Sequence, residues 1–199
     1  MNLRRPQYSL FVMITFMTLL CVTLAWWRNS CEVFPSKTEM TRAREAIQHD
    51  HMLSSSEKHL YTNIVMDASS WRSGLVNELR LDRRYSSFGL RVKRIVWRSK
   101  SVLGDRSIVL VHDLLRNTPP YESPLTCLVT DERNRVVYWQ RVADKSIRFQ
   151  AAQVFVDQDA RCCLSITAMN WFAGPGEFVY RVQSDKLIEV DRPTWVWPN

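Results

Sequence analysis

The feature that most constrains this chain is an uncharged apolar run near its N-terminus. Leu10 to Trp27 are 18 consecutive residues without a charged side chain, interrupted only by three threonines. As a helix this run would be about 27 Å long, close to the thickness of the hydrocarbon layer of a bilayer. Tyr8 precedes it and Trp26 and Trp27 end it, where amphipathic rings favour the headgroup region. We therefore expect residues 8–27 to form a transmembrane anchor.

A cleaved secretory signal is the alternative for the same segment. It would begin with Arg4 and Arg5 and end after the small residues of Thr23-Leu24-Ala25. The apolar run is longer than the usual signal, and such a cleavage would leave Trp26 at the new N-terminus, so we favour the anchor. Because a short tail is usually retained and a long domain crosses largely regardless of charge, we expect residues 1–7 in the cytoplasm and the domain outside.

The segment from Tyr8 to Trp27 resembles the anchors of small single-pass bacterial envelope proteins of unassigned function. The likeness consists of an aromatic-Ser-Leu start, Tyr8-Ser9-Leu10, and an apolar run that ends in tryptophan. It covers about 20 of the 199 residues. The resemblance implies a compartment, the bacterial envelope, and no activity.

Two N-capping signatures follow the apolar run. Ser36 with Glu39, and Ser54 with Glu57, have the spacing of a capping box, in which the hydroxyl and the carboxylate each accept a hydrogen bond from a backbone N–H group. The first helix should be half exposed because its apolar stripe is thin, whereas the second has a fuller stripe. A third, shorter helical stripe comes next. We expect residues 28–80 to form a helical neck that begins the soluble part.

From Phe88 onward the spacing of apolar residues changes from helical to alternating. Seven short runs rich in β-forming residues are separated by turn residues: SIVLVHDLL, LTCLVT, RVVYWQRV, IRFQAAQVFV, RCCLSITAM, EFVYRVQ and KLIEVDR. No helical pattern lies between them, which predicts antiparallel hairpins. The expected fold is α+β: an N-terminal transmembrane helix, a short helical neck and a mainly antiparallel β domain over residues 81–199. A β-sandwich is the alternative.

The cysteines allow one disulfide hypothesis. In an oxidising compartment Cys127 would be able to pair with Cys162 or Cys163, provided that their strands are neighbours. Only one of the vicinal pair can face Cys127, because successive residues of a strand point to opposite faces. The alternative is that Cys162 and Cys163 are small apolar residues of a buried strand.

Sequence motifs of catalysis are missing. The chain has no glycine-rich nucleotide loop, no Walker lysine motif and no nucleophile elbow, and it contains only five glycines. His49 and His51 flank Asp50, but residues two apart on a helix point about 200° from one another and cannot share an ion. His112, beside Asp113, is the one candidate base. We assign no catalytic residue, metal ligand or cofactor.

The strongest functional indication is a concentration of positive charge. The basic stretch from Arg72 to Lys100 contains nine basic and two acidic residues, a local charge of +7. Aromatic residues are interleaved with the charges, as on surfaces that bind anionic polymers. We define the basic-aromatic patch by seven of its residues: Arg83, Arg84, Arg91, Lys93, Arg94, Trp97 and Arg98.

Three hypotheses for function follow. The first is a membrane-anchored, non-enzymatic envelope interaction module whose basic-aromatic patch binds anionic lipid, polysaccharide or an acidic protein. Nucleic acid would be the partner only if the domain were cytoplasmic. The second is a secreted or anchored hydrolase that uses His112, and the third is a structural envelope protein without a dedicated ligand.

Overall fold

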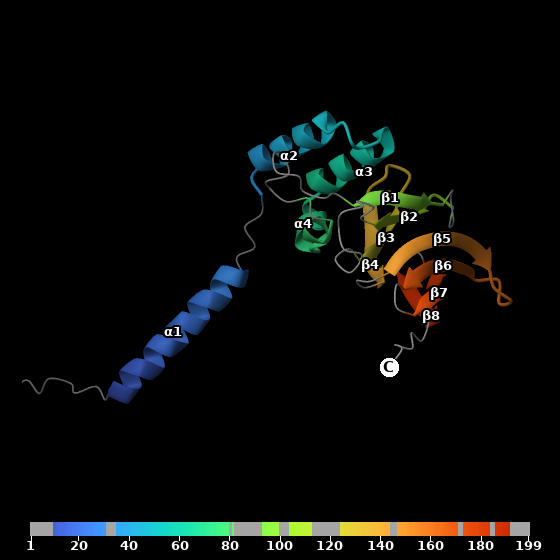
Figure 1. Ribbon diagram of the computed structural model, residues 1–199. Coiled ribbons are helices and arrows are strands. Elements are labelled where there is room, and N and C mark those ends of the chain that lie inside the picture. Colours follow the sequence, from blue (N-terminus) through green and yellow to red (C-terminus); the bar gives the residue numbers. More distant parts are fainter. Residues whose placement is uncertain are drawn as a thin grey trace, which may run out of the picture. The chain divides into compact units, whose positions relative to one another are not determined.

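The structure divides the chain into two compact units, Met1–Phe34 and Pro35–Asn199. It is a computed structural model, shown in Figure 1. The residues that it describes are 10–30, 35–79, 81, 93–99, 104–112, 124–143, 147–170, 173–183 and 186–191.

The first unit contains one helix, α1, which spans Leu10–Ser30. Its three threonines do not interrupt the helix, because each hydroxyl donates to a carbonyl oxygen four residues earlier, 2.8–2.9 Å away. Large apolar side chains of α1 are exposed, from Phe11 at 76% to Leu24 at 50%. In the part of the chain that the structure describes, no helix combines the length and the apolar character needed to cross a membrane.

The second unit opens with helices at the predicted places. The four are α2 (Lys37–His49), α3 (Ser55–Met66), α4 (Ala68–Arg72) and α5 (Leu75–Glu78). Both capping boxes are confirmed: Ser36 with Glu39 begins α2, and Ser54 with Glu57 begins α3. The expected third helix is instead two short helices. Gly74 between them has φ +76°, a left-handed conformation that interrupts the α-helix.

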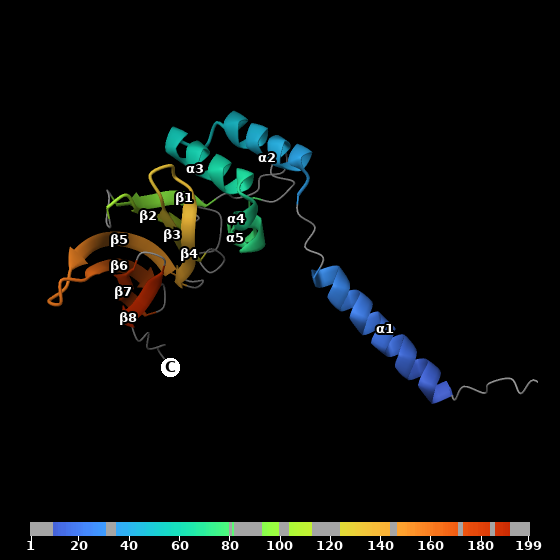
Figure 2. The ribbon, with the colours of Figure 1, turned by 180° about the vertical axis from the view of Figure 1, so that it is seen from behind.

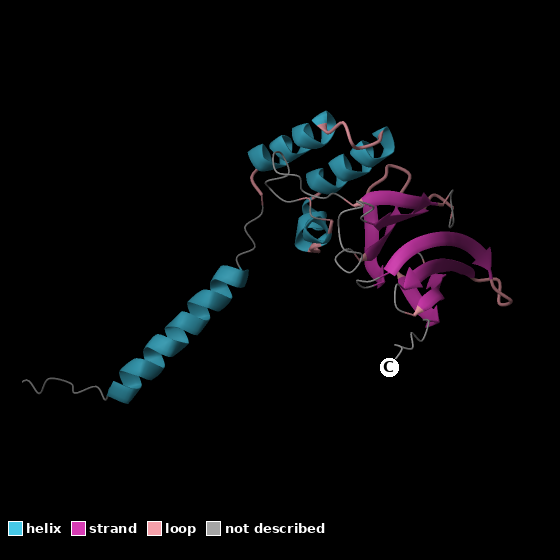
Figure 3. Ribbon diagram, viewed as in Figure 1, coloured by secondary structure: helices cyan, strands magenta, loops and turns pink. Residues whose placement is uncertain are grey.

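Two four-stranded antiparallel sheets follow, as Figure 3 shows. The first has the order β1 (Arg94–Arg98), β2 (Ser107–His112), β3 (Leu125–Thr130) and β4 (Val136–Ala143). The second has the order β5 (Ile147–Val156), β6 (Cys162–Asn170), β7 (Gly174–Val182) and β8 (Leu187–Asp191). Every described pair of neighbours is antiparallel, so the mixed helix and antiparallel sheet architecture is confirmed.

The first sheet is buried on both faces. Val109 and Val111 of β2 belong to a core shared with the helices, whereas Ile108 and Leu110 belong to a core shared with β5–β8. This alternation explains why β2 and β3 are buried along almost their whole length. Figures 1 and 2 show the helices and the second sheet on different sides of β1–β4.

The helices therefore belong to the folded unit. Ala43 and Ile47 of α2 are 4% and 0% exposed and lie in the same core as Leu128 of β3. The remaining side chains of α2 are exposed or half-buried, which agrees with the half-exposed helix that its thin apolar stripe predicted. A thin stripe is sufficient because α3, α5, β2 and β3 also contribute buried apolar residues to this core.

The β3–β4 and β5–β6 hairpins have turns of the same kind, in which an aspartate side chain accepts backbone hydrogen bonds. Asp131 accepts from the N–H groups of Arg133 and Arg135 at 2.9 and 2.8 Å. Asp157 accepts from those of the second and fourth residues after it at 2.9 and 2.8 Å. These N–H groups, that of Arg161 above all, hold the pKa of Asp157 below its usual range.

The second of these turns contains a strained alanine. Ala160 has φ +58°, a left-handed conformation that costs a non-glycine residue about 1–2 kcal/mol. Replacing Ala160 by glycine removes this cost, and the additional backbone entropy that glycine loses on folding is smaller. The free energy of unfolding should therefore rise by about 0.5–1 kcal/mol. Denaturant unfolding of the two proteins checks this. Asn134 occupies the same place in the other turn, and because asparagine tolerates this conformation, Asn134→Gly should bring no gain.

Candidate functional site

The structure describes four of the seven residues in the basic-aromatic patch. Lys93 comes just before β1, while Arg94, Trp97 and Arg98 lie within it. The other three, Arg83, Arg84 and Arg91, lie outside the described residues. The four described side chains have different surroundings, and two of them make ion pairs with acidic residues of the helices.

Lys93 lies inside the fold and not on its surface. It is 2% exposed, and its Nζ donates to Oε1 of Glu78 and to Oγ1 of Thr126, each at 2.8 Å. Thr126 donates in turn to the Glu78 carboxylate at 3.0 Å. Arg141 of β4 binds the other carboxylate oxygen with its Nη2 at 2.6 Å. The Glu78 carboxylate thereby joins α5 to Lys93, to β3 and to β4.

Glu78 is held in its charged form by this arrangement. Burial alone would raise the pKa of its carboxyl group. The hydrogen bonds and positive charges of Arg141 and Lys93 outweigh burial, and the pKa lies below its usual value of 4.5. A carboxylate and an ammonium group, 9% and 3% exposed, thus form a paired, hydrogen-bonded site between helices and sheet.

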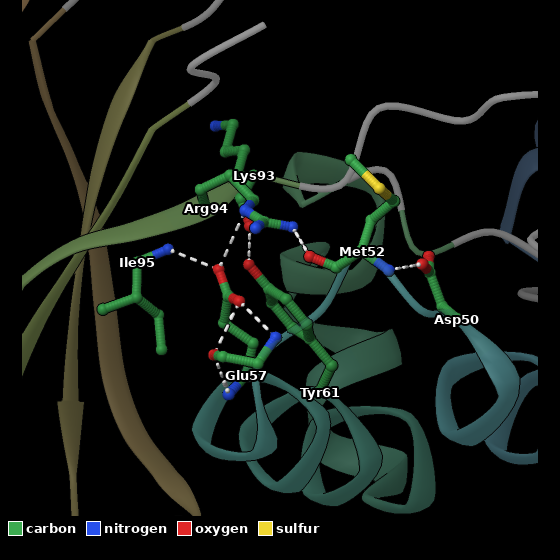
Figure 4. A network of polar contacts seen from close by, with 8 residues as sticks. Asp50, Met52, Glu57, Tyr61, Lys93, Arg94 and Ile95 are labelled. Atoms are coloured by element: carbon green, nitrogen blue, oxygen red, sulfur yellow. Dashed lines mark hydrogen bonds and ion pairs between the residues drawn. The ribbon is translucent and has the colours of Figure 1, made fainter.

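Arg94 makes the second contact between β1 and the helices, shown in Figure 4. Its Nε lies 3.3 Å from Oε1 of Glu57, and the backbone N–H of Ile95 donates to the same oxygen at 3.1 Å. The other oxygen, Oε2, accepts from the N–H and the hydroxyl of Ser54 at 2.8 and 2.7 Å. Tyr61 donates its hydroxyl hydrogen to the Lys93 carbonyl. Glu57 therefore caps α3 and also binds the first strand.

We call these two clusters together the polar seam, defined by Glu57, Glu78, Lys93, Arg94 and Thr126. The seam joins the helical layer to the first sheet. In the chain, Glu57 precedes its partner Ile95 by 38 residues, and Glu78 precedes Lys93 by 15 residues. Charge composition alone did not reveal these pairings, because the carboxylates come from separate helices.

The remaining two described patch residues differ in exposure. Arg98 is exposed and bonds to the side chains of Asn134 and Ser56 at the rim of the sheet. Trp97 is half-buried and packs against the core between the two sheets. Of the four described residues, Arg98 is thus the one with an exposed side chain, and Arg94 is half-buried.

The cysteines of the predicted disulfide are free thiols in the structure. Cys127 is buried in the core between the sheets, and Cys162 and Cys163 begin β6. Cys162 packs against the same core, whereas Cys163 lies 3.8 Å from Oδ2 of Asp157. The two vicinal thiols thus have different surroundings, as expected for neighbours on a strand. Burial raises the pKa of the Cys127 thiol far above its usual range.

Thiol labelling tests this state of Cys127. Because the thiolate is the reactive form, N-ethylmaleimide near neutral pH should leave Cys127 unmodified in the folded protein. After unfolding in denaturant without reductant, the thiol should be labelled completely, as peptide mass spectrometry would measure. Labelling that required a reductant as well would show instead that Cys127 is in a disulfide.

The histidines offer no assembled catalytic site among the described residues. His112, the candidate base, is 5% exposed, and Asp113 lies outside the part that the structure describes. His49 and His51 lie near the end of α2, and the described residues include no group of three side chains able to hold a metal ion.

An open groove lies between α4 and the edge strand β4. It has a volume of about 310 Å³ and is lined by Ser69, Ser70, Ser73, Leu75, Val136, Val137, Tyr138 and Trp139. The Trp139 indole N–H donates to the Ser73 hydroxyl at 3.2 Å across it. Sequence reasoning did not find this groove. The apolar residues of RVVYWQRV indicated a strand. They did not indicate which helix would form the other wall of the groove.

Comparisons with known protein families, with curated proteins and with solved structures find no match to the chain. Function is therefore argued from the residues and geometry described above.

Proposed function

We propose that this protein is a non-enzymatic interaction module that its N-terminal helix anchors in a membrane. The exposed apolar surface of α1 supports this most directly. Phe11, Phe16 and Leu19, 76%, 63% and 59% exposed, would be covered by lipid chains. In the sequence, the uncharged run from Leu10 to Trp27 has 18 residues, within the range of transmembrane helices.

The domain is proposed to lie outside the cytoplasm, in a bacterial envelope, with residues 1–7 inside. A short basic N-terminal tail supports this orientation. The second unit has its own two cores, so it would fold without help from the anchor.

The proposed partner is anionic: lipid headgroups, an envelope polysaccharide or an acidic protein surface. Arg98 supports this as an exposed cation, and Arg83, Arg84 and Arg91 add three further positive charges in the same stretch of sequence. Lys93 has its positive charge matched inside the fold, so we exclude it from the proposed binding surface. Nucleic acid would take the place of these partners if the domain proved cytoplasmic.

Fractionation of cells tests the anchor. The full-length protein should sediment with membranes, resist alkaline carbonate extraction and require detergent for release. Protease added to intact spheroplasts should digest the domain, and N-terminal sequencing of the untreated protein should begin at or near Met1. A protein that stays in the soluble fraction with its first residues intact would overturn the proposed anchor, and a new N-terminus near Trp26 would show a cleaved signal.

The anionic surface is tested separately, with a charge-matched control. The variant Arg83→Gln/Arg84→Gln/Arg91→Gln should lose about tenfold in affinity for vesicles containing anionic lipid or for an acidic polysaccharide at low salt. The control, Arg148→Gln/Arg161→Gln/Lys186→Gln, removes three exposed charges elsewhere and should lose much less. Equal losses in the two variants would show that net charge alone attracts these partners.

A further inference from the structure

The groove beside β4 suggests a second binding surface, independent of the anionic-partner surface proposed above. β4 is the last strand of the first sheet, and among the described strands it pairs with β3 alone. Alternate N–H and C=O groups of an edge strand point away from its neighbour and are able to pair with another extended chain. In the described part of the chain, an edge without a second strand and an apolar groove thus occur side by side.

The groove has the chemistry that strand addition requires. Its β4 wall includes Val137, 45% exposed, and its floor includes the buried Leu75. Its other wall carries the exposed Ser69 and Ser73, whose hydroxyls donate to Asp67 and to the Ser70 carbonyl and retain acceptor capacity. An extended peptide would bond to the edge of β4 through its backbone and place alternate apolar side chains in the groove.

Charge distinguishes between possible occupants. The segment from Asp131 to Arg141 contains three arginines and two acidic residues, a local charge of +1. Arg133, Arg135 and Arg141 are all exposed, and they lie at the two ends of β4. A second copy of this chain would bring the same positive segment against itself, and like charges across a strand pair are destabilising. An acidic strand would be complementary.

We propose that the groove between α4 and β4 binds an extended segment of another protein, apolar at alternate positions and acidic at both ends. The segment adds as a fifth strand to the first sheet. Its acidic ends contact Arg135 and Arg141. Arg135 already pairs with Asp131, and Arg141 with Glu78, but the two arginine side chains are 61% and 49% exposed. Strand pairing supplies affinity, and the arginines supply selectivity for acidic partners.

The test uses synthetic peptides and the full-length protein in detergent micelles. The probe is a fluorescent peptide of about eight residues, the length of an ordinary strand, in which valine alternates with threonine and each end is glutamate. One comparison peptide has lysine at both ends, and another has proline at its centre and cannot pair fully. Fluorescence anisotropy should show binding of the acidic peptide, about tenfold weaker binding of the lysine peptide and loss of binding with proline.

Matched variants locate the binding. Val137→Glu places a charge in the groove and should weaken the acidic peptide about tenfold. Val190→Glu makes the same change on β8, the edge strand of the second sheet, where valine is 53% exposed, and should leave binding within about twofold. Thermal unfolding should show that both variants remain folded, because both sites are exposed. Arg133→Glu/Arg135→Glu should reverse the preference between the acidic and lysine peptides.

Three outcomes would overturn the proposal. They are no binding of the acidic peptide to the intact protein, equal weakening by Val137→Glu and Val190→Glu, and a dimer that Val137→Glu dissociates while no peptide binds. The last outcome would assign the edge to a second copy of the chain. None of these outcomes affects the vesicle and polysaccharide measurements on Arg83, Arg84 and Arg91, so the two surfaces fail or stand separately.

Discussion

Replacing Glu78 by leucine is expected to lower the free energy of unfolding by about 3–5 kcal/mol. The substitution removes the carboxylate that lies 2.8 Å from the Lys93 ammonium group, which is 3% exposed. Thr126 remains as a neutral partner at 2.8 Å, but a hydroxyl does not compensate the cost of a buried charge. Denaturant unfolding of the full-length protein in detergent, followed by tryptophan fluorescence, measures the loss.

Two further variants separate the charge from other effects. Glu45→Leu makes the same substitution on the exposed surface of α2 and should change stability by no more than about 0.5 kcal/mol. Glu78→Leu/Lys93→Met removes both buried charges and should recover much of the loss, since an apolar pair of similar volume often replaces a buried ion pair at little cost. If the double variant is no more stable than Glu78→Leu, the loss does not come from the unpaired lysine.

The same carboxyl predicts a pH dependence. Because the pKa of Glu78 is lower in the folded protein than its usual value of 4.5, its contribution is fully present above about pH 4.5 and is lost as the pH falls through the folded value. The difference in unfolding free energy between the native protein and Glu78→Leu should therefore narrow in acid. A difference that stays constant between neutral pH and pH 3 would contradict the lowered pKa.

Local sequence signals predicted the elements of this fold well. Ser36 with Glu39 and Ser54 with Glu57 begin two helices, because a capping box is contained within four residues and needs no tertiary contact. The β-rich runs became strands for a similar reason, since β-branched and aromatic residues between turn residues favour extended chain. Their antiparallel pairing followed from the absence of helices between them.

The sequence did not predict that two residues of the basic stretch, Lys93 and Arg94, would form ion pairs in the polar seam. A dense run of lysine and arginine normally indicates a solvated surface, which is the interpretation from which the basic-aromatic patch was predicted. Lys93 and Arg94 instead contact carboxylates that come from α5 and α3. Such pairings are tertiary, and neither partner has a local signal for the other. Glu57 did have a signal, as a cap, but a capping box gives no indication that its second oxygen binds another strand.

Glu57 provides the second prediction, because it performs both roles at once. Glu57→Ala is expected to lower the free energy of unfolding by about 3 kcal/mol. The change removes the acceptor for the backbone N–H of Ile95 and the ion pair with Arg94, as well as the capping bonds to Ser54. Glu57 is 4% exposed, so water does not replace these partners readily.

The first capping box of the chain supplies the control. Glu39 makes the same bonds to Ser36 as Glu57 makes to Ser54, at 2.7 and 3.1 Å, but it lies at the exposed start of α2. Glu39→Ala should therefore cost only about 1 kcal/mol, the usual value of a lost cap. The excess cost of Glu57→Ala over Glu39→Ala measures what the polar seam contributes beyond capping, and Arg94→Met should reproduce part of that excess. If the two alanine variants were equally stable, Glu57 would act as a cap alone, and the helices would be held on the sheet by their apolar core without its help.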